Sequence, residues 1–167
     1  MPTPSFISDL RRKIGNTLLL LPTVAVVTYD AQGRMLLVRH SGASHWGTPG
    51  GIIEPAQTPA DAAVRETWEE TGVLVELVRI LGVFGGEHCA TTYANGDQIA
   101  WISTLFEARA LEGSPHPDGE EVAEARYFDA AEVAGLPLRP HMQMFLQAAR
   151  TAPPGGFFQP PTWRPGA

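Results

Sequence analysis

One short segment, residues 50–73, constrains the fold more than any other part of the chain. It starts with two consecutive glycines and continues into a helix whose two ends are both marked by the sequence. Thr58 is the expected N-cap, a proline follows at the first helical position, and Asp61 stands three residues after the cap, as in a capping box with Asp in place of Glu or Gln. Gly72 favours the left-handed conformation that ends many helices. These features predict a helix over residues 59–71.

Two unlike faces result when this helix is plotted at about 100° per residue. The stripe expected to be buried consists of Ala60, Val64, Thr67, Trp68 and Thr71. Glu66, Glu69 and Glu70 share the opposite side, where like charges at this spacing repel one another. Carboxylates that crowd together beside a glycine loop favour oxygen coordination of a hard divalent cation such as Mg²⁺. The alternative is a solvated acidic face, which is common on helices.

The same segment resembles the signature box of the Nudix hydrolase superfamily, the MutT-like fold. That box is a glycine, five residues, a glutamate, seven residues and then Arg-Glu-aliphatic-x-Glu-Glu-x-Gly-aliphatic. The matching positions are Gly51, Arg65, Glu66, Glu69, Glu70, Gly72 and Val73. Two positions depart from the box, because Gln57 stands in place of the first glutamate and Thr67 in place of the aliphatic residue. The charge missing at Gln57 is expected to weaken a second or third metal ion.

The resemblance implies a fold, an activity and a cofactor. The fold is α+β, with a mixed β-sheet sandwiched between α-helices. The activity is hydrolysis of a nucleoside diphosphate linked to another moiety, through attack of water on a pyrophosphate bond. The cofactor is Mg²⁺ or Mn²⁺, and its expected ligands are Glu66, Glu69, Glu70 and the carbonyl oxygen of Gly50.

The resemblance leaves the general base open between two sets of residues. One option is a glutamate of the box, Glu66 or Glu69, although both are also expected metal ligands. The other option is Glu121, because family members carry an acidic residue about six positions before the aromatic residue of a later strand. For Glu121 and its neighbours the alternative is a solvated acidic loop without a catalytic role.

Four residues in or beside the box have expected structural roles. Arg65 is expected to orient the box by pairing with a neighbouring carboxylate such as Glu54. Gly51 allows the loop backbone to approach a metal ion without obstruction by a side chain. Gly72 closes the helix, as described above.

The substrate is less well specified than the metal site. We expect Tyr93 and Trp101 to flank the nucleotide pocket, although aromatic residues in strands more often belong to the core. ADP-ribose pyrophosphatases carry a proline near position 15 after the box, whereas the sequence from Val73 to Pro115 has none before its last residue. Tyr93 lies somewhat beyond the position of the tyrosine that marks dinucleoside polyphosphate hydrolases. The sequence therefore selects no single nucleotide.

Composition narrows the range of partners and locations. The formal net charge of −6 leaves no broad basic surface, so we expect a small-molecule nucleotide substrate and no nucleic-acid partner. Pro22 interrupts the apolar run that follows a basic N-terminal segment, and the run is too short to span a bilayer, so we expect no membrane partner and a cytoplasmic protein. A single cysteine, Cys89, excludes an intrachain disulfide. A homodimer stays open, because family members are often dimers.

The rest of the chain alternates apolar runs with turn residues. We expect strands over residues 22–29, 34–40, 73–84, 88–93, 98–107 and 126–128, with two hairpins, one between the first two strands and one around Asn95-Gly96. We expect further helices over residues 5–15 and 140–149, and a loop over residues 111–119. The expected units are an N-terminal helix packed on the domain (residues 1–17), a Nudix hydrolase domain (18–150) and a tail rich in proline, glycine and aromatic residues (151–167).

Two other functions compete with hydrolysis. One is a catalytically weak Nudix domain that acts as a nucleotide-binding sensor. Only Gln57 favours it, since all three helix glutamates are present. The other is isomerisation of an allylic diphosphate, which uses the same fold and requires a catalytic cysteine. No motif surrounds Cys89, so this second alternative has little support.

Overall fold

Ten regular elements are found in the described part of the chain, residues 4–117 and 119–156 of the computed structural model. The helices are α1 (Ser5–Ile14), α2 (Pro59–Thr71), α3 (Ala130–Gly135) and α4 (Met142–Thr151). The strands are β1 (Leu19–Tyr29), β2 (Met35–His40), β3 (Leu74–Phe84), β4 (Ala90–Thr92), β5 (Gln98–Glu112) and β6 (Val122–Phe128). Most of the expected tail, residues 157–167, lies outside the described residues, and the division into three units stays a prediction.

The strands form one mixed sheet in the order β3-β5-β1-β2-β6, with β4 paired to β5 beside this path. β1 and β5 run parallel, from Leu19 opposite Ile99 to Tyr29 opposite Arg109. The other pairs are antiparallel. The two predicted hairpins are confirmed, because β1 pairs with β2 and β4 pairs with β5.

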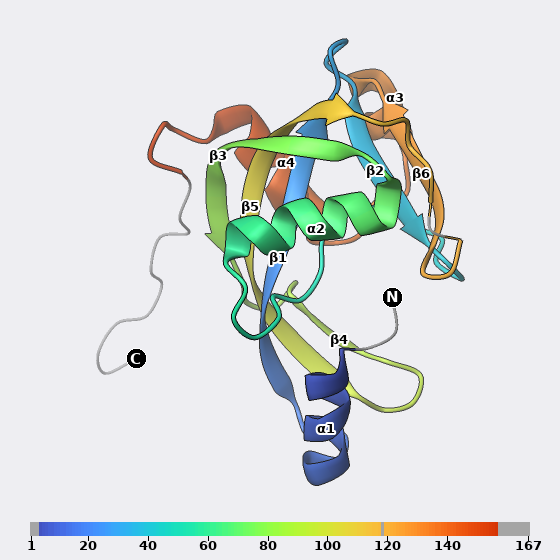
Figure 1. Ribbon diagram of the computed structural model, residues 1–167, viewed down its shortest axis with the longest axis vertical. Helices are drawn as coiled ribbons and strands as arrows, with labels where there is room; N and C mark the ends of the chain where they lie inside the picture. Colours follow the sequence, from blue (N-terminus) through green and yellow to red (C-terminus); the bar gives the residue numbers. More distant parts are fainter. Residues whose placement is uncertain (1–3, 118, 157–167) are drawn as a thin grey trace.

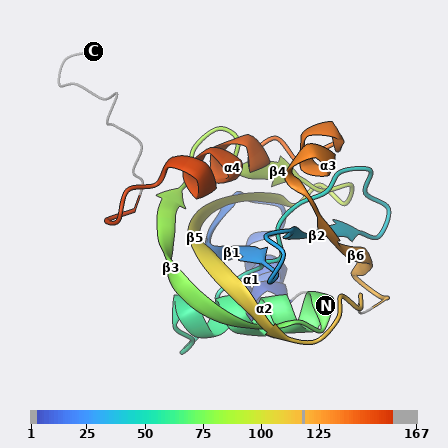
Figure 2. The same ribbon diagram turned by 90° about the horizontal axis from the view of Figure 1, so that it is seen from above.

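Helices cover both faces of this sheet (Figures 1 and 2). On one face lies α2, whose buried Ala62 and Ala63 share an apolar cluster with Val26 of β1. On the other face lie α3 and α4, and Phe145 of α4 shares a second cluster with Leu105 of β5. The predicted α+β architecture, a mixed sheet between helices, is therefore confirmed.

α1 lies beside the N-terminal ends of the parallel strands β1 and β5 (Figure 1). Its predicted boundaries, residues 5–15, are nearly those observed, and Ile7 is its buried residue. Arg11 holds the helix in place, because its guanidinium group donates to the carbonyl oxygen of Gln98 at 2.7 Å and lies 3.4 Å from the carboxylate of Asp97.

Several strands are longer than the sequence indicated. β1 starts before Pro22, a residue that usually ends a strand. β5 continues to Glu112, because its last residues pair with β3, so the expected loop over 111–119 is shorter. β6 begins at Val122 because it stays paired with β2 as far as His40. This last pairing has a functional consequence, since it brings the end of β2 next to the acidic segment that precedes β6.

Candidate metal and catalytic site

The helix that carries the three glutamates is fixed at both ends. Thr58 is the N-cap, and its hydroxyl oxygen accepts a hydrogen bond from the backbone N–H of Asp61 at 3.1 Å. The same hydroxyl donates to the Asp61 carboxylate at 2.7 Å, but the contacts of the described residues do not include the bond from the Thr58 backbone N–H to Asp61 that would complete the predicted capping box. At the other end Gly72 adopts φ 66°, in the left-handed region, and its N–H donates to the carbonyl of Trp68. The predicted helix over residues 59–71 is confirmed.

The predicted buried stripe of α2 is only partly correct, because Thr67 and Thr71 are buried as expected but the buried side is rotated away from Ala60 and Trp68. The buried residues are Ala62, Ala63, Glu66, Thr67, Glu70 and Thr71. Trp68, expected in the core, is 52% exposed, and Ala60 is exposed as well. The small side chains of Ala62 and Ala63 let the helix approach the sheet closely along the side that also carries two glutamates. Two carboxylates are therefore turned inward, toward the glycine loop.

The two glycines of that loop are needed for different reasons. Gly50 has φ 151°, and a Cβ atom there would lie 2.8 Å from Cα of Ala25 and even closer to the carbonyl oxygen of Val24. Gly51 faces the helix instead, where a Cβ atom would lie 2.5 Å from Cδ of Glu66. The first glycine therefore lets the loop lie against β1, and the second makes room for a carboxylate.

The loop is attached to β1 by its carbonyl groups on either side of Gly50. The carbonyls of Pro49 and Gly51 accept hydrogen bonds from the N–H groups of Val26 and Val24, each at 2.9 Å. The N–H of Gly50 donates to Oε2 of Glu70 at 3.0 Å. Within the described residues, the Gly50 carbonyl oxygen has no hydrogen-bond donor. This oxygen therefore has the capacity to act as a metal ligand.

Arg65 organises the other two glutamates. Its guanidinium group forms ion pairs with Glu66 at 2.8 Å and Glu69 at 2.7 Å. It also donates to Oε1 of Gln57 at 3.2 Å. Pairing of Arg65 with Glu54 stays a prediction, whereas its pairing with the two box glutamates is observed. Gln57, which replaces the first glutamate of the box, thus accepts this hydrogen bond with an uncharged oxygen.

Burial acts on the ionisation of this cluster. The Glu66 side chain is 7% exposed, and its burial raises the pKa of the carboxyl group, against the opposing effect of the nearby Arg65 charge. Burial alone would lower the pKa of Arg65, but the charges of Glu66 and Glu69 outweigh this and raise it. A buried carboxylate is costly without a compensating cation, so a divalent ion beside Glu66 would stabilise its charged form.

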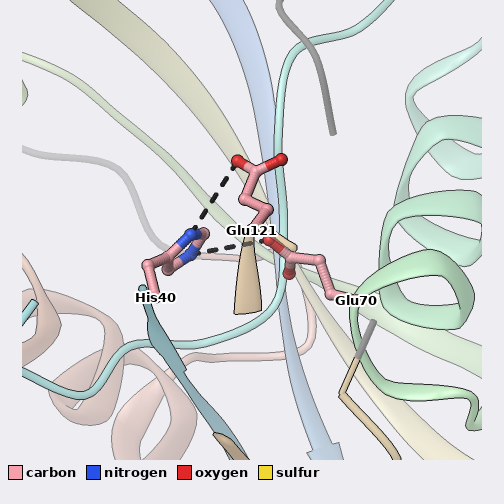
Figure 3. A group of neighbouring side chains, drawn as sticks. All are labelled: His40, Glu70 and Glu121. Carbon is pink, nitrogen blue, oxygen red and sulfur yellow. Dashed lines mark ion pairs between the residues drawn. The ribbon is translucent and has the colours of Figure 1, made fainter. Parts of the chain in front are cut away.

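A second group of side chains joins three elements at one point (Figure 3). His40 at the end of β2 lies between Glu70 of α2 and Glu121, which precedes β6. Nε2 of His40 is 3.5 Å from Oε1 of Glu70, and Nδ1 is 3.8 Å from Oε1 of Glu121. One donor atom from each residue lies within 4.8 Å of the others. The structure thus brings the two predicted residues Glu70 and Glu121 together through a histidine that sequence reasoning missed.

The predicted substrate residues lie near two residues ahead of α4: Tyr93 is close to Arg139, and Trp101 contacts His141. Tyr93 is 54% exposed at the turn after β4. Trp101 of β5 is half-buried, with its ring edge-on to His141 at 5.8 Å between centroids. Burial and the neighbouring charge of Arg139 lower the pKa of His141 to about 4, so this imidazole is neutral at physiological pH.

Arg139 was not predicted. It lies close enough to Glu70 of the metal site for the two charges to interact. Its backbone N–H donates to the carbonyl of Trp46, and its side chain lies along Gly47, where an added Cβ atom would be 3.3 Å from Cδ. Burial lowers the pKa of its guanidinium group, and the charges of Glu70 and Tyr93 oppose this effect. Among the described residues the guanidinium group has no hydrogen-bond or ion-pair partner.

The family follows from comparison with known proteins. The sequence matches the NUDIX domain family over residues 19–149. This chain is a member of the NUDIX family. A MutT-like protein of Streptomyces ambofaciens is 40% identical to it over 126 residues, which cover 71% of this chain and 82% of the relative. A Mycobacterium tuberculosis protein provisionally named 8-oxo-dGTP diphosphatase 3 is 36% identical over 115 residues, or 68% of this chain.

The NUDIX chain spans only half the length of that Mycobacterium tuberculosis relative. Among solved structures, a MutT NUDIX hydrolase from Burkholderia pseudomallei superimposes with a TM-score of 0.63 over 78% of this chain and 98% of the other, at 23% identity. This likeness supports the fold. In the described residues, every helix is too short or too polar to cross a membrane. The expected homodimer and the cytoplasmic location stay predictions.

Proposed function

We propose that this NUDIX protein hydrolyses the pyrophosphate bond of a nucleoside diphosphate linked to another moiety, with Mg²⁺ or Mn²⁺ as cofactor. The observation that carries the proposal is the inward orientation of the carboxylates of Glu66 and Glu70, which are 5% and 4% exposed, against the Gly50-Gly51 loop. A helix that needed only solubility would direct these charges to water. Burial of both of them is explained by a cation that they share.

The donor set fits a hard divalent ion. Glu66, Glu69 and Glu70 offer carboxylate oxygens, and the Gly50 carbonyl offers an oxygen without a donor in the described residues. Mg²⁺ and Mn²⁺ prefer oxygen ligands, and Mg²⁺ shares phosphate oxygens with its substrate. When bound, such an ion neutralises the diphosphate and lowers the pKa of a coordinated water.

Residues of the chain would act as the general base and hold the metal-binding carboxylates in position. Glu121 is the favoured general base, because its side chain is 39% exposed and lies beside His40, with an oxygen within 4.8 Å of an oxygen of Glu70. There it would accept the proton of the attacking water. Glu66 and Glu69 are weaker candidates for this step, since both are engaged by Arg65. Arg65 would hold these two carboxylates in place and have no contact with substrate.

Gln57, the one feature that favours the sensor alternative, has contacts that do not require a loss of catalysis. Gln57 accepts hydrogen bonds from Arg65 at 3.2 Å and from the N–H of Glu54 at 3.3 Å. The glutamine therefore has an orienting function in the loop, and its presence does not by itself indicate lost catalysis.

Hydrolysis is tested with a panel of ADP-ribose, dinucleoside polyphosphates, oxidised deoxynucleotides, nucleoside diphosphates and nucleotide sugars. We expect product release from at least one compound in the presence of Mg²⁺ or Mn²⁺, and none when EDTA removes the metal. Calorimetric titration of the same panel separates the alternatives. Tight nucleotide binding without turnover under any metal condition would support the sensor and contradict the proposal.

We further propose that Tyr93, Trp101 and Arg139 form the substrate wall of this site. The two aromatic rings offer surfaces for a nucleobase, and the guanidinium of Arg139, which has no partner among the described residues, offers a charge for a phosphate. Alanine substitution of each should raise KM for the best nucleotide by about tenfold, the value of one lost stacking or charged contact. Trp68→Ala is the matched control, since Trp68 is exposed on α2 away from its buried face. Unchanged KM in all three variants would contradict this assignment.

A further inference from the structure

His40 occupies a position that the proposed mechanism has not used. Its ring is 20% exposed, and each of its two nitrogens faces a carboxylate, Nε2 toward Glu70 and Nδ1 toward Glu121 (Figure 3). The separations of 3.5 Å and 3.8 Å exceed the usual N–H···O distance of about 2.7–3.2 Å. The imidazole of His40 thus lies between two carboxylates that come from different parts of the chain.

The spacing of His40 and Glu70 suits two ligands of one ion. Donors at about 2.1 Å from an octahedral metal are about 3 Å apart when adjacent and about 4 Å apart when opposite. Nε2 of His40 and Oε1 of Glu70 are 3.5 Å apart, which lies between these two values.

Backbone contacts position His40 and Glu121 together before any ion binds. The ladder between β2 and β6 places His40 opposite Val122, the residue after Glu121. Beyond the ladder, the N–H of Ser41 donates to the carbonyl of Glu121 at 2.8 Å, and its hydroxyl donates to the carbonyl of Glu120 at 3.1 Å. The other carboxylate belongs to Glu70, whose second oxygen is held by the N–H of Gly50.

We propose that His40 supplies a ring nitrogen to the divalent ion held by Glu70, next to the proposed base Glu121, so that the site prefers Mn²⁺ over Mg²⁺. The proposal rests on the proposed function, in which Glu70 is a metal ligand. Its chemical basis is that Mn²⁺, although it prefers oxygen ligands as Mg²⁺ does, is a first-row transition ion and accepts an imidazole nitrogen more readily than the harder Mg²⁺. The competing role is that His40 only positions Glu121 by a hydrogen bond and has no contact with the metal.

Pulsed electron paramagnetic resonance of Mn²⁺ bound to the chain of residues 1–167 separates these two roles. A coordinated imidazole nitrogen gives a ¹⁴N modulation of the Mn²⁺ echo, which a positioning residue outside the coordination sphere does not give. We expect the modulation in the wild type, its loss in His40→Gln, and its retention in His45→Gln, which alters an exposed histidine of the following loop. In calorimetric titrations, His40→Gln should weaken Mn²⁺ binding by about tenfold and Mg²⁺ binding much less.

A wild-type Mn²⁺ complex without the nitrogen modulation would overturn the proposal, and this measurement does not depend on whether His40→Gln folds. Equal weakening of Mn²⁺ and Mg²⁺ binding in His40→Gln, with the modulation unchanged, would also overturn it. If the proposed function itself is wrong, the wild type is expected to bind neither ion and to hydrolyse no compound of the panel. Hydrolysis without nitrogen coordination would leave the proposed function intact and remove only the role of His40.

Discussion

Glu69→Gln is expected to lower kcat for metal-dependent hydrolysis by about a thousandfold, or about 4 kcal/mol of transition-state stabilisation. The amide keeps the size of the side chain but removes a negative charge that is proposed to hold the ion. Glu69 is the best glutamate to change, because its side chain is 36% exposed, whereas those of Glu66 and Glu70 are buried. Arg65 would still be held by Glu66 and Gln57, so the fold should survive.

Glu76→Gln is the matched control for this experiment. Glu76 is an exposed carboxylate on β3 that forms an ion pair with Arg109, outside the proposed site. We expect its variant to keep the wild-type kcat, and both variants to keep the wild-type melting temperature. Steady-state kinetics at saturating substrate measures the difference. A Glu69→Gln enzyme within about threefold of the wild type would show that the α2 carboxylates do not carry the chemistry.

Gly50→Ala is expected to lower the free energy of unfolding by about 3 kcal/mol or more. Its φ of 151° is a backbone conformation that alanine rarely adopts, and the new methyl group would collide with the β1 backbone at Val24 and Ala25. Backbone atoms within a sheet cannot move aside as a side chain can. Urea denaturation measures the change.

Two other glycines provide the comparison. Gly51→Ala would meet only the end of the Glu66 side chain, which can rotate, so we expect near-normal stability and weakened Mn²⁺ binding. Gly155→Ala, in a segment where no atom lies within 4 Å of the added Cβ, should change neither property. Wild-type stability of Gly50→Ala would contradict the close packing of the loop on β1.

Local signals explain why some elements could be read from the sequence. The cap at Thr58 and the left-handed Gly72 act within one turn of the helix, so the ends of α2 follow from neighbouring residues alone. The Asn95-Gly96 turn likewise favours its hairpin without help from distant residues. The spacing of the box glutamates also requires only one helix.

The rotation of α2 could not be read in this way. Hydrophobicity placed Trp68 inside and the glutamates outside, and the structure shows the reverse for Trp68, Glu66 and Glu70. A prediction from periodicity assumes that the apolar residues of a helix occupy its buried side. Here the close approach of Ala62 and Ala63 to the sheet decides the rotation, and the carboxylates gain hydrogen bonds and ion pairs that offset part of their burial.

The sequence by itself determined the family box, the limits of its helix and the identity of three clustered carboxylates, because each depends only on residues of the single segment 50–73. Tertiary structure alone decided that Glu70 and Glu121 meet at His40 and that Arg139 approaches the same site. The pairing of β2 with β6 and the return of the chain ahead of α4 create these contacts between residues far apart in sequence. No spacing rule along the chain encodes such contacts, since they depend on how the sheet orders its strands.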